Sequence, residues 1–313
     1  MKTNVAILGY GNLGKALEEL ILLESNICLV AIFSRRNNVS SKFNTPVYKR
    51  KQLLQFKGKI DLLILCGGSQ NDIINDAQYY SKHFNTINTF DTHELIPKLL
   101  NKLNNIAKQS NHVAILSAGW DPGLFSITKA TFSSILNKPC TCFWGKGVSM
   151  GHSQAVKNLE HVTDAISLTI PNKIAKRCLE KHKPIKTPLH SRKVYVVSKH
   201  HSLNKNIKNK IINIPHYFKN QKVSVRFVSS KKLNKLKTLK HMGEVICTTP
   251  NNLLHLKIKM TNNAMLTAKI ILSYTRAIKT LIKKYHSGAY TPLHFSPLDL
   301  SPLSEIETIK KFC

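Results

Sequence analysis

The sequence of 313 residues predicts an α/β protein in which a doubly wound parallel sheet is followed by a second, α+β domain with an open mixed sheet. Short apolar runs alternate with helical patterns over residues 1–118, at the spacing that crossover helices give to parallel strands. From residue 119 onward, strand-like runs are separated by loops rich in Lys and Pro. We therefore expect a first domain over 1–118, a second over 119–263, and a C-terminal segment, 264–313, that packs back on the first.

The first domain is expected to contain a series of parallel strands. A helix from Lys15 to Leu23 follows the first of them. Ligands of doubly wound sheets bind beyond the carboxyl ends of the strands, so the residues at those ends are the first candidates for a site. The predicted strands are Val5–Leu8, Cys28–Phe33, Leu62–Cys66, Ile87–Phe90 and Val113–Ser117.

The second domain is expected to begin with a helix. Asp121-Pro122 has the residues of a helix start, with Asp as N-cap and Pro at the first helical position, and an amphipathic stretch continues to Leu136. We interpret the basic segment Ser229–His241 as a loop. The long helix Ala264–Tyr285 has apolar residues at helical spacing and is expected to cover the first domain. The strands predicted between them are Thr141–Trp144, Val162–Ile170, Lys193–Ser198, Val223–Val228, Glu244–Thr248 and Leu253–Met260.

The glycine-rich turn after the first strand predicts a dinucleotide site. The run GYGNLG supplies Gly9 for a tight turn, Gly11 for the approach of a pyrophosphate, and Gly14 for the packing of the next helix on the strand. The N-terminus of that helix then faces the phosphates. Together with the alternating strands and helices, this turn indicates a Rossmann-type dinucleotide-binding domain.

The end of the second strand favours NADP over NAD. A carboxylate there would accept hydrogen bonds from the ribose hydroxyls but repel a 2′-phosphate, whereas the guanidinium groups of Arg35 and Arg36 bind one through charge-assisted hydrogen bonds. The alternative is a chance glycine turn with two solvated arginines. We expect NADP as the cofactor, bound by Gly9, Tyr10, Gly11, Asn12, Leu13, Gly14, Ser34, Arg35, Arg36, Cys66, Gly67, Gly68, Ser69, Phe90, Asp91, Ser117, Ala118, Gly119, Trp120 and Asp121.

The formal net charge of +31 is concentrated in the second domain, where residues 119–263 carry 26 Lys+Arg against 5 Asp+Glu. Such charge attracts nucleic acid, acidic membranes or polyanionic ligands, and its sign alone does not choose among them. The basic segment Ser229–His241 lacks aromatic residues that would stack on bases. Our leading explanation for the net charge is that the composition has drifted toward Lys, Asn and Ile at surface positions that tolerate substitution. We expect no specific nucleic-acid partner, while adventitious polyanion binding stays open.

Cysteine usage and hydropathy indicate the compartment. No run of about 18 apolar residues occurs, and the first strand begins at once, leaving no room for a signal peptide. Seven cysteines are scattered without a CxxC pair, which favours reduced thiols over a disulfide framework or a zinc site. We expect a cytoplasmic protein with no membrane span and no metal.

Two aspartates at strand ends are candidates for the chemistry. Asp91 and Asp121 fall beside the expected nicotinamide site, where two carboxylates could bind an ammonium group and one could accept its proton. The alternatives are a helix cap for Asp121 and a solvated turn residue for Asp91. Trp144, itself more often a core residue, opens the loop WGKGVSMGHS, whose amides, hydroxyl and imidazole suit a carboxylate. Its His152 is as readily structural.

Several segments together resemble the meso-diaminopimelate D-dehydrogenase family over nearly the whole chain. They are GYGNLG with the Ser-Arg-Arg run, LCGGS at 65–69, NTFDTH at 88–93, SAGWDPGLFSI at 117–127 and FWGKGVSMGHS at 143–153. The resemblance implies NADP-dependent oxidative deamination of the D-centre of meso-2,6-diaminopimelate. The product, L-2-amino-6-oxopimelate, cyclises to tetrahydrodipicolinate. The resemblance also implies a role in lysine and peptidoglycan precursor synthesis, and a homodimer.

The same resemblance assigns residues to a substrate site. The family's substrate-binding aspartates fall on Asp91 and Asp121, which are the candidate catalytic residues. A guanidinium, a hydroxyl, an imidazole and an amide suit the distal amino-carboxylate of the L-centre. The remaining substrate-binding residues implied are Trp144, Met150, Gly151 and Ser153 near the D-centre, and Thr169, Arg192, His241 and Asn263 near the L-centre.

This chain departs from the family pattern at two places in the substrate site. Family members commonly carry Gln at the position of Met150, and a Gly-rich segment where this chain reads Lys240 to Glu244. Its second domain is also far more basic. Two other functions stay open: an NADP-binding enzyme of the same fold that acts on another amino acid, and a polyanion-binding protein that uses the basic second domain.

Overall fold

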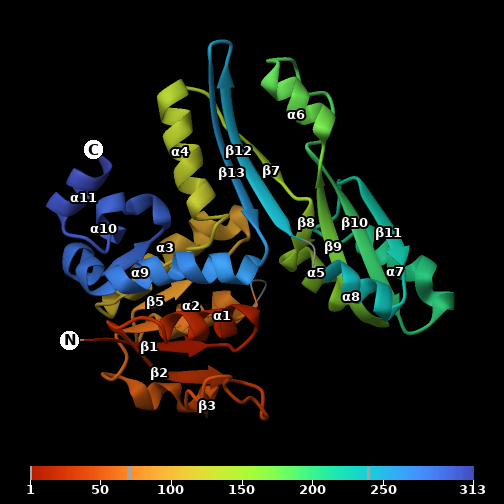
Figure 1. Ribbon diagram of the computed structural model, residues 1–313. Helices are drawn as coiled ribbons and strands as arrows, with labels where there is room; N and C mark the ends of the chain where they lie inside the picture. The colour runs from red at the N-terminus through yellow and green to blue at the C-terminus, as the bar shows by residue number, and fades with distance from the viewer. Residues whose placement is uncertain (1, 69–71, 238–239) are drawn as a thin grey trace. The chain divides into compact units, whose positions relative to one another are not determined.

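The computed structural model describes residues 2–68, 72–237 and 240–313 (Figure 1). The chain forms two compact units. One consists of Met1–Ile127 together with Ala264–Cys313, and the other of Thr128–Asn263. Among the described helices, none combines the length and the apolarity that a membrane span requires.

The first unit contains a seven-stranded sheet in the order β14-β6-β5-β4-β1-β2-β3. Every neighbouring pair is parallel, which confirms the predicted doubly wound parallel sheet. Two of its strands, β3 and β14, were not predicted. The strands are β1 (Thr3–Leu8), β2 (Ile27–Ser34), β3 (Val47–Lys49), β4 (Leu62–Leu65), β5 (Thr86–Asn88), β6 (Val113–Ile115) and β14 (Gly288–Tyr290).

Both faces of this sheet are covered by helices, because alternate residues of each strand point to opposite sides. Val5 and Ile7 of β1 pack in one apolar core with α1 (Asn12–Ile21) and α9 (Asn263–Tyr285). The intervening β1 residues pack on the other side with α2 (Asp72–Tyr80) and α3 (Ile96–Gln109). The shorter elements are η1 (Arg50–Phe56), η2 (His93–Leu95), η4 (Pro292–His294), α10 (Pro297–Leu300) and α11 (Glu305–Phe312).

The helix expected to start at Asp121-Pro122 begins later. Helix α4 spans Leu124–Leu136, so the prediction that Asp121 is its N-cap was wrong. The cause is a tight turn before the helix, in which the Gly119 N–H donates to the Pro122 carbonyl at 3.1 Å. Gly123 has a φ of +127° there, and a Cβ on it would lie 1.9 Å from the Gly119 carbonyl oxygen. The turn occupies the residues that would otherwise have formed the first helical turn.

The second unit contains two sheets where one open mixed sheet was predicted. A four-stranded sheet has the order β11-β10-β9-β8, and a three-stranded sheet has the order β13-β12-β7. Only β10 and β11 are parallel among these described pairs; the others are antiparallel. The strands are β7 (Thr141–Trp144), β8 (Gly147–Ser149), β9 (Val162–Pro171), β10 (His190–Ser198), β11 (Val223–Phe227), β12 (His241–Thr249) and β13 (Asn252–Met260).

The second unit is also more helical than predicted. The basic segment from Ser229 was expected to be a loop, but residues 230–237 form helix α8 (Ser230–Lys237). The reason is a short apolar stripe, because Leu233 is fully buried against Ile166 and Leu168 of β9, with Leu236 packed beside it. The other helices of this unit are α5 (Met150–Lys157), α6 (Lys173–Glu180), η3 (His201–Leu203) and α7 (Asn204–Ile212).

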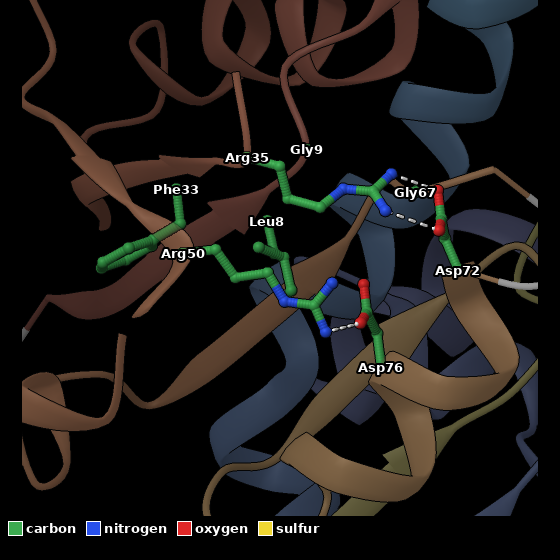
Figure 2. A pocket seen from close by; sticks show the side chains of 8 residues that line it. All are labelled: Leu8, Gly9, Phe33, Arg35, Arg50, Gly67, Asp72 and Asp76. Carbon is green, nitrogen blue, oxygen red and sulfur yellow. Dashed lines mark hydrogen bonds and ion pairs between the residues drawn. The ribbon is translucent and has the colours of Figure 1, made fainter. Parts of the chain in front are cut away.

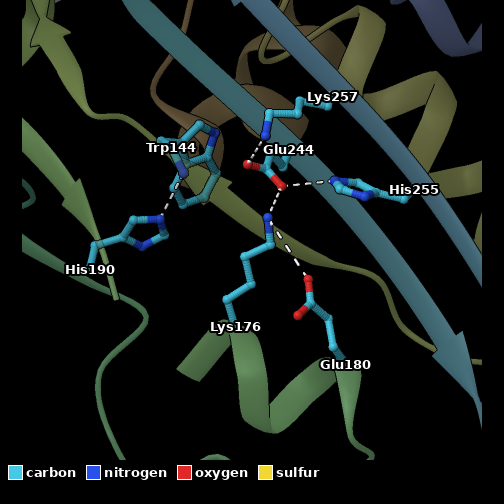
Figure 3. A network of polar contacts seen from close by, with 7 residues as sticks. All are labelled: Trp144, Lys176, Glu180, His190, Glu244, His255 and Lys257. Atoms are coloured by element: carbon cyan, nitrogen blue, oxygen red, sulfur yellow. Dashed lines mark hydrogen bonds and ion pairs between the residues drawn. The ribbon is translucent and has the colours of Figure 1, made fainter. Parts of the chain in front are cut away.

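A single carboxylate ties three elements of the second unit together (Figure 3). Glu244 on β12 pairs with Lys176 on α6. On β13 it pairs with His255, at 2.8 Å, and with Lys257, at 3.5 Å. Burial raises the pKa of Glu244, but the hydrogen bonds and charges of these partners outweigh it and hold the pKa below its ordinary value. Glu244 is therefore ionised at neutral pH and links the three-stranded sheet to α6.

Candidate active site

The glycine-rich turn has the geometry that a dinucleotide requires. Gly9, with a φ of +103°, directly follows β1, and a Cβ on it would lie 2.9 Å from the Cys66 carbonyl oxygen. A Cβ on Gly14 would lie 2.3 Å from the carbonyl oxygen of Gly9, so α1 can approach the turn only with glycine there. No atom of the described residues lies within 4 Å of a Cβ added to Gly11. The turn is thus closed on the protein side and open where a pyrophosphate would lie.

Positively charged groups gather beside this turn (Figure 2). Arg35 forms a bidentate ion pair with Asp72, at 2.9 and 2.5 Å, and the Arg36 guanidinium donates to the Tyr10 carbonyl at 2.5 Å. Arg35 is exposed, so a phosphate can reach it. A third guanidinium of the group, that of Arg50, was not identified from the sequence. It follows β3, a strand of only three residues that was not predicted. The pocket is lined by Leu8, Gly9, Phe33, Arg35, Arg50, Gly67, Asp72 and Asp76.

A buried carboxylate that the sequence did not single out supports the same turn. Glu18 on α1 is fully buried and accepts hydrogen bonds from the hydroxyls of Tyr10 and Ser41. Burial raises the pKa of Glu18, but hydrogen bonds led by the one from Ser41 outweigh it and bring the pKa below its ordinary value. Glu18 therefore links Tyr10 to Ser41 in the segment after β2. The backbone carbonyl of Tyr10, which accepts the hydrogen bond from Arg36, is held in place by the same link.

Asp91 and Asp121 follow neighbouring strands, β5 and β6, as predicted from the strand ends. The side-chain oxygen of Asn88 accepts hydrogen bonds from the Phe90 and Ser117 N–H groups, at 3.0 and 3.4 Å, and so ties together the two segments that carry the aspartates. Asp91 is exposed. The Asp121 side chain is only 5% exposed and lies 3.9 Å from His93 Nε2. Asn88 was not identified from the sequence, because its role depends on the pairing of β5 with β6.

In the second unit, the loop after β7 packs tightly on two of the predicted substrate residues. A Cβ on Gly145, which has a φ of +97°, would lie 2.1 Å from the Thr169 carbonyl oxygen. A Cβ on Gly147 would lie 2.6 Å from Nδ1 of His241. The two glycines thus bring the Trp144 loop against the backbone of Thr169 on β9 and against His241 on β12.

Arg192 is the centre of this group. It lies opposite Thr169 in the β9–β10 pair, donates to the Thr169 hydroxyl, and donates to Gln221 at 2.8 Å. Burial lowers the pKa of Arg192 to about 10, which leaves it charged at neutral pH. In the part of the chain that the structure describes, no carboxylate lies within ion-pair distance of it. A half-buried cation of this kind is suited to the carboxylate of a ligand, since pairing offsets its partial desolvation.

The histidines around Arg192 are neutral. Burial is the first cause that lowers the pKa of His152, His190 and His241, and the charge of Arg192 lowers each further. The pKa falls to about 3 for His152 and to about 4 for His190. Arg192 is therefore the cation in this cluster, and the imidazoles contribute polar surface without charge.

The segment predicted to hold the D-centre carboxylate is the start of helix α5. Met150 and Gly151 are its first two residues, so their N–H groups have no helical acceptor and suit an anion. The Ser153 hydroxyl, in contrast, donates to the Ser149 carbonyl at 2.6 Å and accepts from the Ser167 N–H at 2.9 Å. The Ser153 hydroxyl therefore already donates one hydrogen bond and accepts one from the backbone of the protein.

The structure brings the predicted residues together in two groups, one in each unit. The glycine turn, the arginine pair and both aspartates belong to the first unit. Trp144, Thr169, Arg192 and His241 form a connected group in the second, and Asn263 is the first residue of α9. Ser69 lies outside the described residues. Within the described chain, no group of three or more His, Cys, Asp or Glu side chains is placed to hold a metal ion.

Comparison with known proteins gives consistent matches. A family model described as the diaminopimelic acid dehydrogenase C-terminal domain matches residues 119–261. The meso-diaminopimelate D-dehydrogenase of Ureibacillus thermosphaericus is 34% identical over 317 residues, covering 97% of each chain. That of Corynebacterium glutamicum is also 34% identical, covering 95% of each chain.

Solved structures of this kind have the same fold. Diaminopimelate dehydrogenase of C. glutamicum in complex with DAP superposes with a TM-score of 0.93 at 31% identity, covering 100% of this chain and 99% of that one. An engineered D-amino acid dehydrogenase bound to NADP+ also gives a TM-score of 0.93, at 30% identity and with both chains fully covered. These matches confirm the predicted two-part α/β architecture.

The neutral histidines predict that the protein is less stable in mild acid. His152 and His190 take up protons near pH 6.5 when unfolded but hold pKa values of about 3 and about 4 when folded. As the pH falls below 6.5, the unfolded state binds more protons than the folded state, so the free energy of unfolding decreases. We expect a loss of roughly 1–2 kcal/mol per histidine between pH 7 and pH 5, measured by urea unfolding.

The matched variant for this prediction is His190→Phe, which removes one of the two imidazoles and should reduce the loss between pH 7 and pH 5. Equal free energies of unfolding of the parent protein at pH 7 and pH 5 would contradict the neutral state of these imidazoles.

Proposed function

Because the chain belongs to the family of meso-diaminopimelate D-dehydrogenases, we propose that it catalyses the reversible, NADP-dependent oxidative deamination of meso-2,6-diaminopimelate at its D-centre. Loss of the hydride leaves an imine that water hydrolyses, so the products are NADPH, ammonia and L-2-amino-6-oxopimelate, which cyclises to tetrahydrodipicolinate. The observation that carries the proposal is the half-buried Arg192 guanidinium, which has no carboxylate partner among the described residues and donates a hydrogen bond to Thr169. It matches a substrate with a second carboxylate far from the reacting carbon.

The cofactor half of the proposal rests on the first unit. When bound, NADP would supply the acceptor for the hydride that leaves the D-centre Cα. The open face at Gly11 and the N-terminus of α1 receive the pyrophosphate. Arg35 and Arg36 at the end of β2 bind the 2′-phosphate, and Tyr10, fastened by Glu18, holds Arg36 in place through its carbonyl.

The two aspartates act on the substrate amine. The amine must be unprotonated as the hydride leaves, so a base has to accept a proton from the ammonium form. We assign this role to Asp121, with Asp91, which follows the neighbouring strand, as a second anion that attracts the ammonium group. The near-complete burial of the Asp121 carboxylate limits the access of bulk water to that proton.

The second unit holds the substrate at its other end. Arg192 binds the distal carboxylate, with Thr169, His241 and Asn263 around the L-centre. The free N–H groups of Met150 and Gly151 at the start of α5 bind the carboxylate of the D-centre. Because Met150 contributes its backbone, its side chain is free to differ from the Gln common in the family. Trp144 provides an apolar wall, and Ser153 supports the α5 turn through its two backbone bonds.

The proposal extends to the organisation of the protein. Residues 1–118 with 264–313 bind the dinucleotide, and residues 119–263 bind the substrate and a second copy of the chain in a homodimer. We place the reaction in the cytoplasm, in the synthesis of lysine and peptidoglycan precursors. Family membership supports these assignments, together with the position of the glycine turn and of Arg192 in different units.

The direct test is NADPH formation by the purified protein. We expect absorbance at the NADPH wavelength to rise with meso-diaminopimelate and NADP⁺, and to rise far less with the LL isomer, which has no D-centre. NAD⁺ should be a much poorer cofactor, because it lacks the 2′-phosphate that the guanidinium groups bind. Equal rates with meso-diaminopimelate and a D-amino acid without a distal carboxylate would instead favour an enzyme of the same fold with another substrate.

Replacing Asp121 with Asn tests the proton acceptor. Asparagine keeps the shape but cannot accept the proton, so kcat should fall about 10²- to 10⁴-fold, the usual contribution of a general base. The dissociation constant for NADP⁺, measured by calorimetry, should change little. Glu19→Gln, at an exposed carboxylate of the same unit, is the control. An equal loss of NADP⁺ binding in the Asp121 variant would show that Asp121 serves the cofactor site instead.

Replacing Arg192 with Ala tests the distal clamp. Loss of a buried charge-assisted pair costs about 2 kcal/mol or more, so KM for meso-diaminopimelate should rise roughly 30-fold or more. NADP⁺ affinity should stay as in the parent protein. Lys193→Ala removes an exposed cation next to it on β10 and should have no effect on KM. An unchanged KM in the Arg192 variant would remove this residue from the substrate site.

A further inference from the structure

His190 contacts Trp144 in two ways (Figure 3). Its Nε2 accepts a hydrogen bond from the Trp144 backbone N–H at 2.8 Å. Its ring also lies against the indole, with centroids 4.8 Å apart and planes inclined at 33°. The imidazole therefore contacts both the main chain and the side chain of Trp144.

The protonation state of His190 suits this contact. An imidazole nitrogen accepts a hydrogen bond only when it carries no proton, so Nε2 must be unprotonated and the proton of the neutral ring lies on Nδ1. Burial lowers the pKa of His190 to about 4, and the charge of Arg192 contributes in the same direction. The acceptor is thus available throughout the neutral range, and His190 is a poor candidate for a proton donor there.

Strand β10 connects His190 to the distal clamp. Residues two positions apart on a strand point to the same face and are separated by about 6.6 Å. His190 and Arg192 are such a pair, and Arg192 lies opposite Thr169 while His190 lies opposite Pro171 on β9. One strand therefore supports the indole through His190 and carries the guanidinium two residues later.

We propose that His190 is a positioning residue of the substrate site, which holds the Trp144 indole at a fixed place relative to the Arg192 guanidinium. The inference rests on the proposed function, because it takes Trp144 and Arg192 as contacts of diaminopimelate. Trp144 and Arg192 then contact different parts of the same substrate, and His190 acts on the first of these contacts. A shift of the indole changes how well the substrate fits without removing any group that takes part in proton or hydride transfer.

His190→Phe and His190→Gln separate the two contacts. Phenylalanine keeps a flat ring but accepts no hydrogen bond, whereas the side-chain oxygen of glutamine can still accept one from the Trp144 N–H. Since a buried hydrogen bond contributes about 0.5–1.5 kcal/mol, His190→Phe should raise KM for meso-diaminopimelate about 3- to 10-fold. We expect kcat to change less than 3-fold and NADP⁺ affinity to stay constant, and His190→Gln to recover most of the lost KM.

A second readout does not depend on activity. Trp144 is one of only two tryptophans in the chain, so near-ultraviolet circular dichroism of the ligand-free protein reports on its surroundings. The signal should change in His190→Phe and return toward that of the parent protein in His190→Gln. His201→Gln, at an exposed histidine, is the matched control and should alter neither KM nor the spectrum. If His190→Phe fails to fold, His190→Ala is used in its place.

The outcomes distinguish this inference from the proposed function. A parent protein without activity on meso-diaminopimelate would overturn the proposed function, while the spectrum would still show whether His190 holds the indole. An unchanged KM or an unchanged spectrum in the folded His190→Phe protein would overturn the positioning role. A fall in kcat at constant KM would overturn it too, because His190 would then act on the chemical step.

Discussion

The site depends on places where one stretch of backbone comes so close to another that no side chain fits between them. Gly14 meets the carbonyl of Gly9 in the first unit, and Gly145 meets that of Thr169 in the second. The first contact sets the N-terminus of α1 against the end of β1. The second sets the Trp144 loop against the strand that carries Thr169. The group of candidate residues in each unit is therefore shaped by main chain, and the charged side chains are added to that frame.

In the second unit, the charge of the candidate group is arranged around one cation. Arg192 is half-buried, the imidazoles near it are neutral, and no carboxylate of the described chain pairs with it. Such a guanidinium is unfavourable to bury and is retained where a ligand supplies the anion. The first unit has the opposite arrangement, since Arg35 and Arg50 there are each paired with an aspartate of α2.

The features readable from the sequence were those encoded by neighbouring residues. The turn at Gly9, the arginines after β2 and the alternating pattern of the first domain are local, and so is the extent of β7 and of the long helix α9. The features that were missed depend on contacts between distant segments. Asn88 joins two strands, and Gln221 reaches Arg192 from another loop. The three missed strands, β3, β8 and β14, are short and lie at sheet edges, whereas the equally short β5 and β6 are central and were predicted. Asp is a common N-cap residue, but the turn that contains Gly123 delays the start of α4, so Asp121 is not its N-cap.

The ion pairs shared by Glu244 indicate that the second unit depends on the salt concentration of the solution. One carboxylate there serves Lys176, His255 and Lys257, in a region with 26 basic residues and 5 acidic ones, so most of its lysines repel one another without an internal counter-charge. Dissolved anions have to supply that compensation, and at physiological ionic strength they screen charges beyond about 8 Å. Dilution of salt should loosen this unit while leaving the parallel sheet, where acids and bases are more evenly matched, comparatively undisturbed.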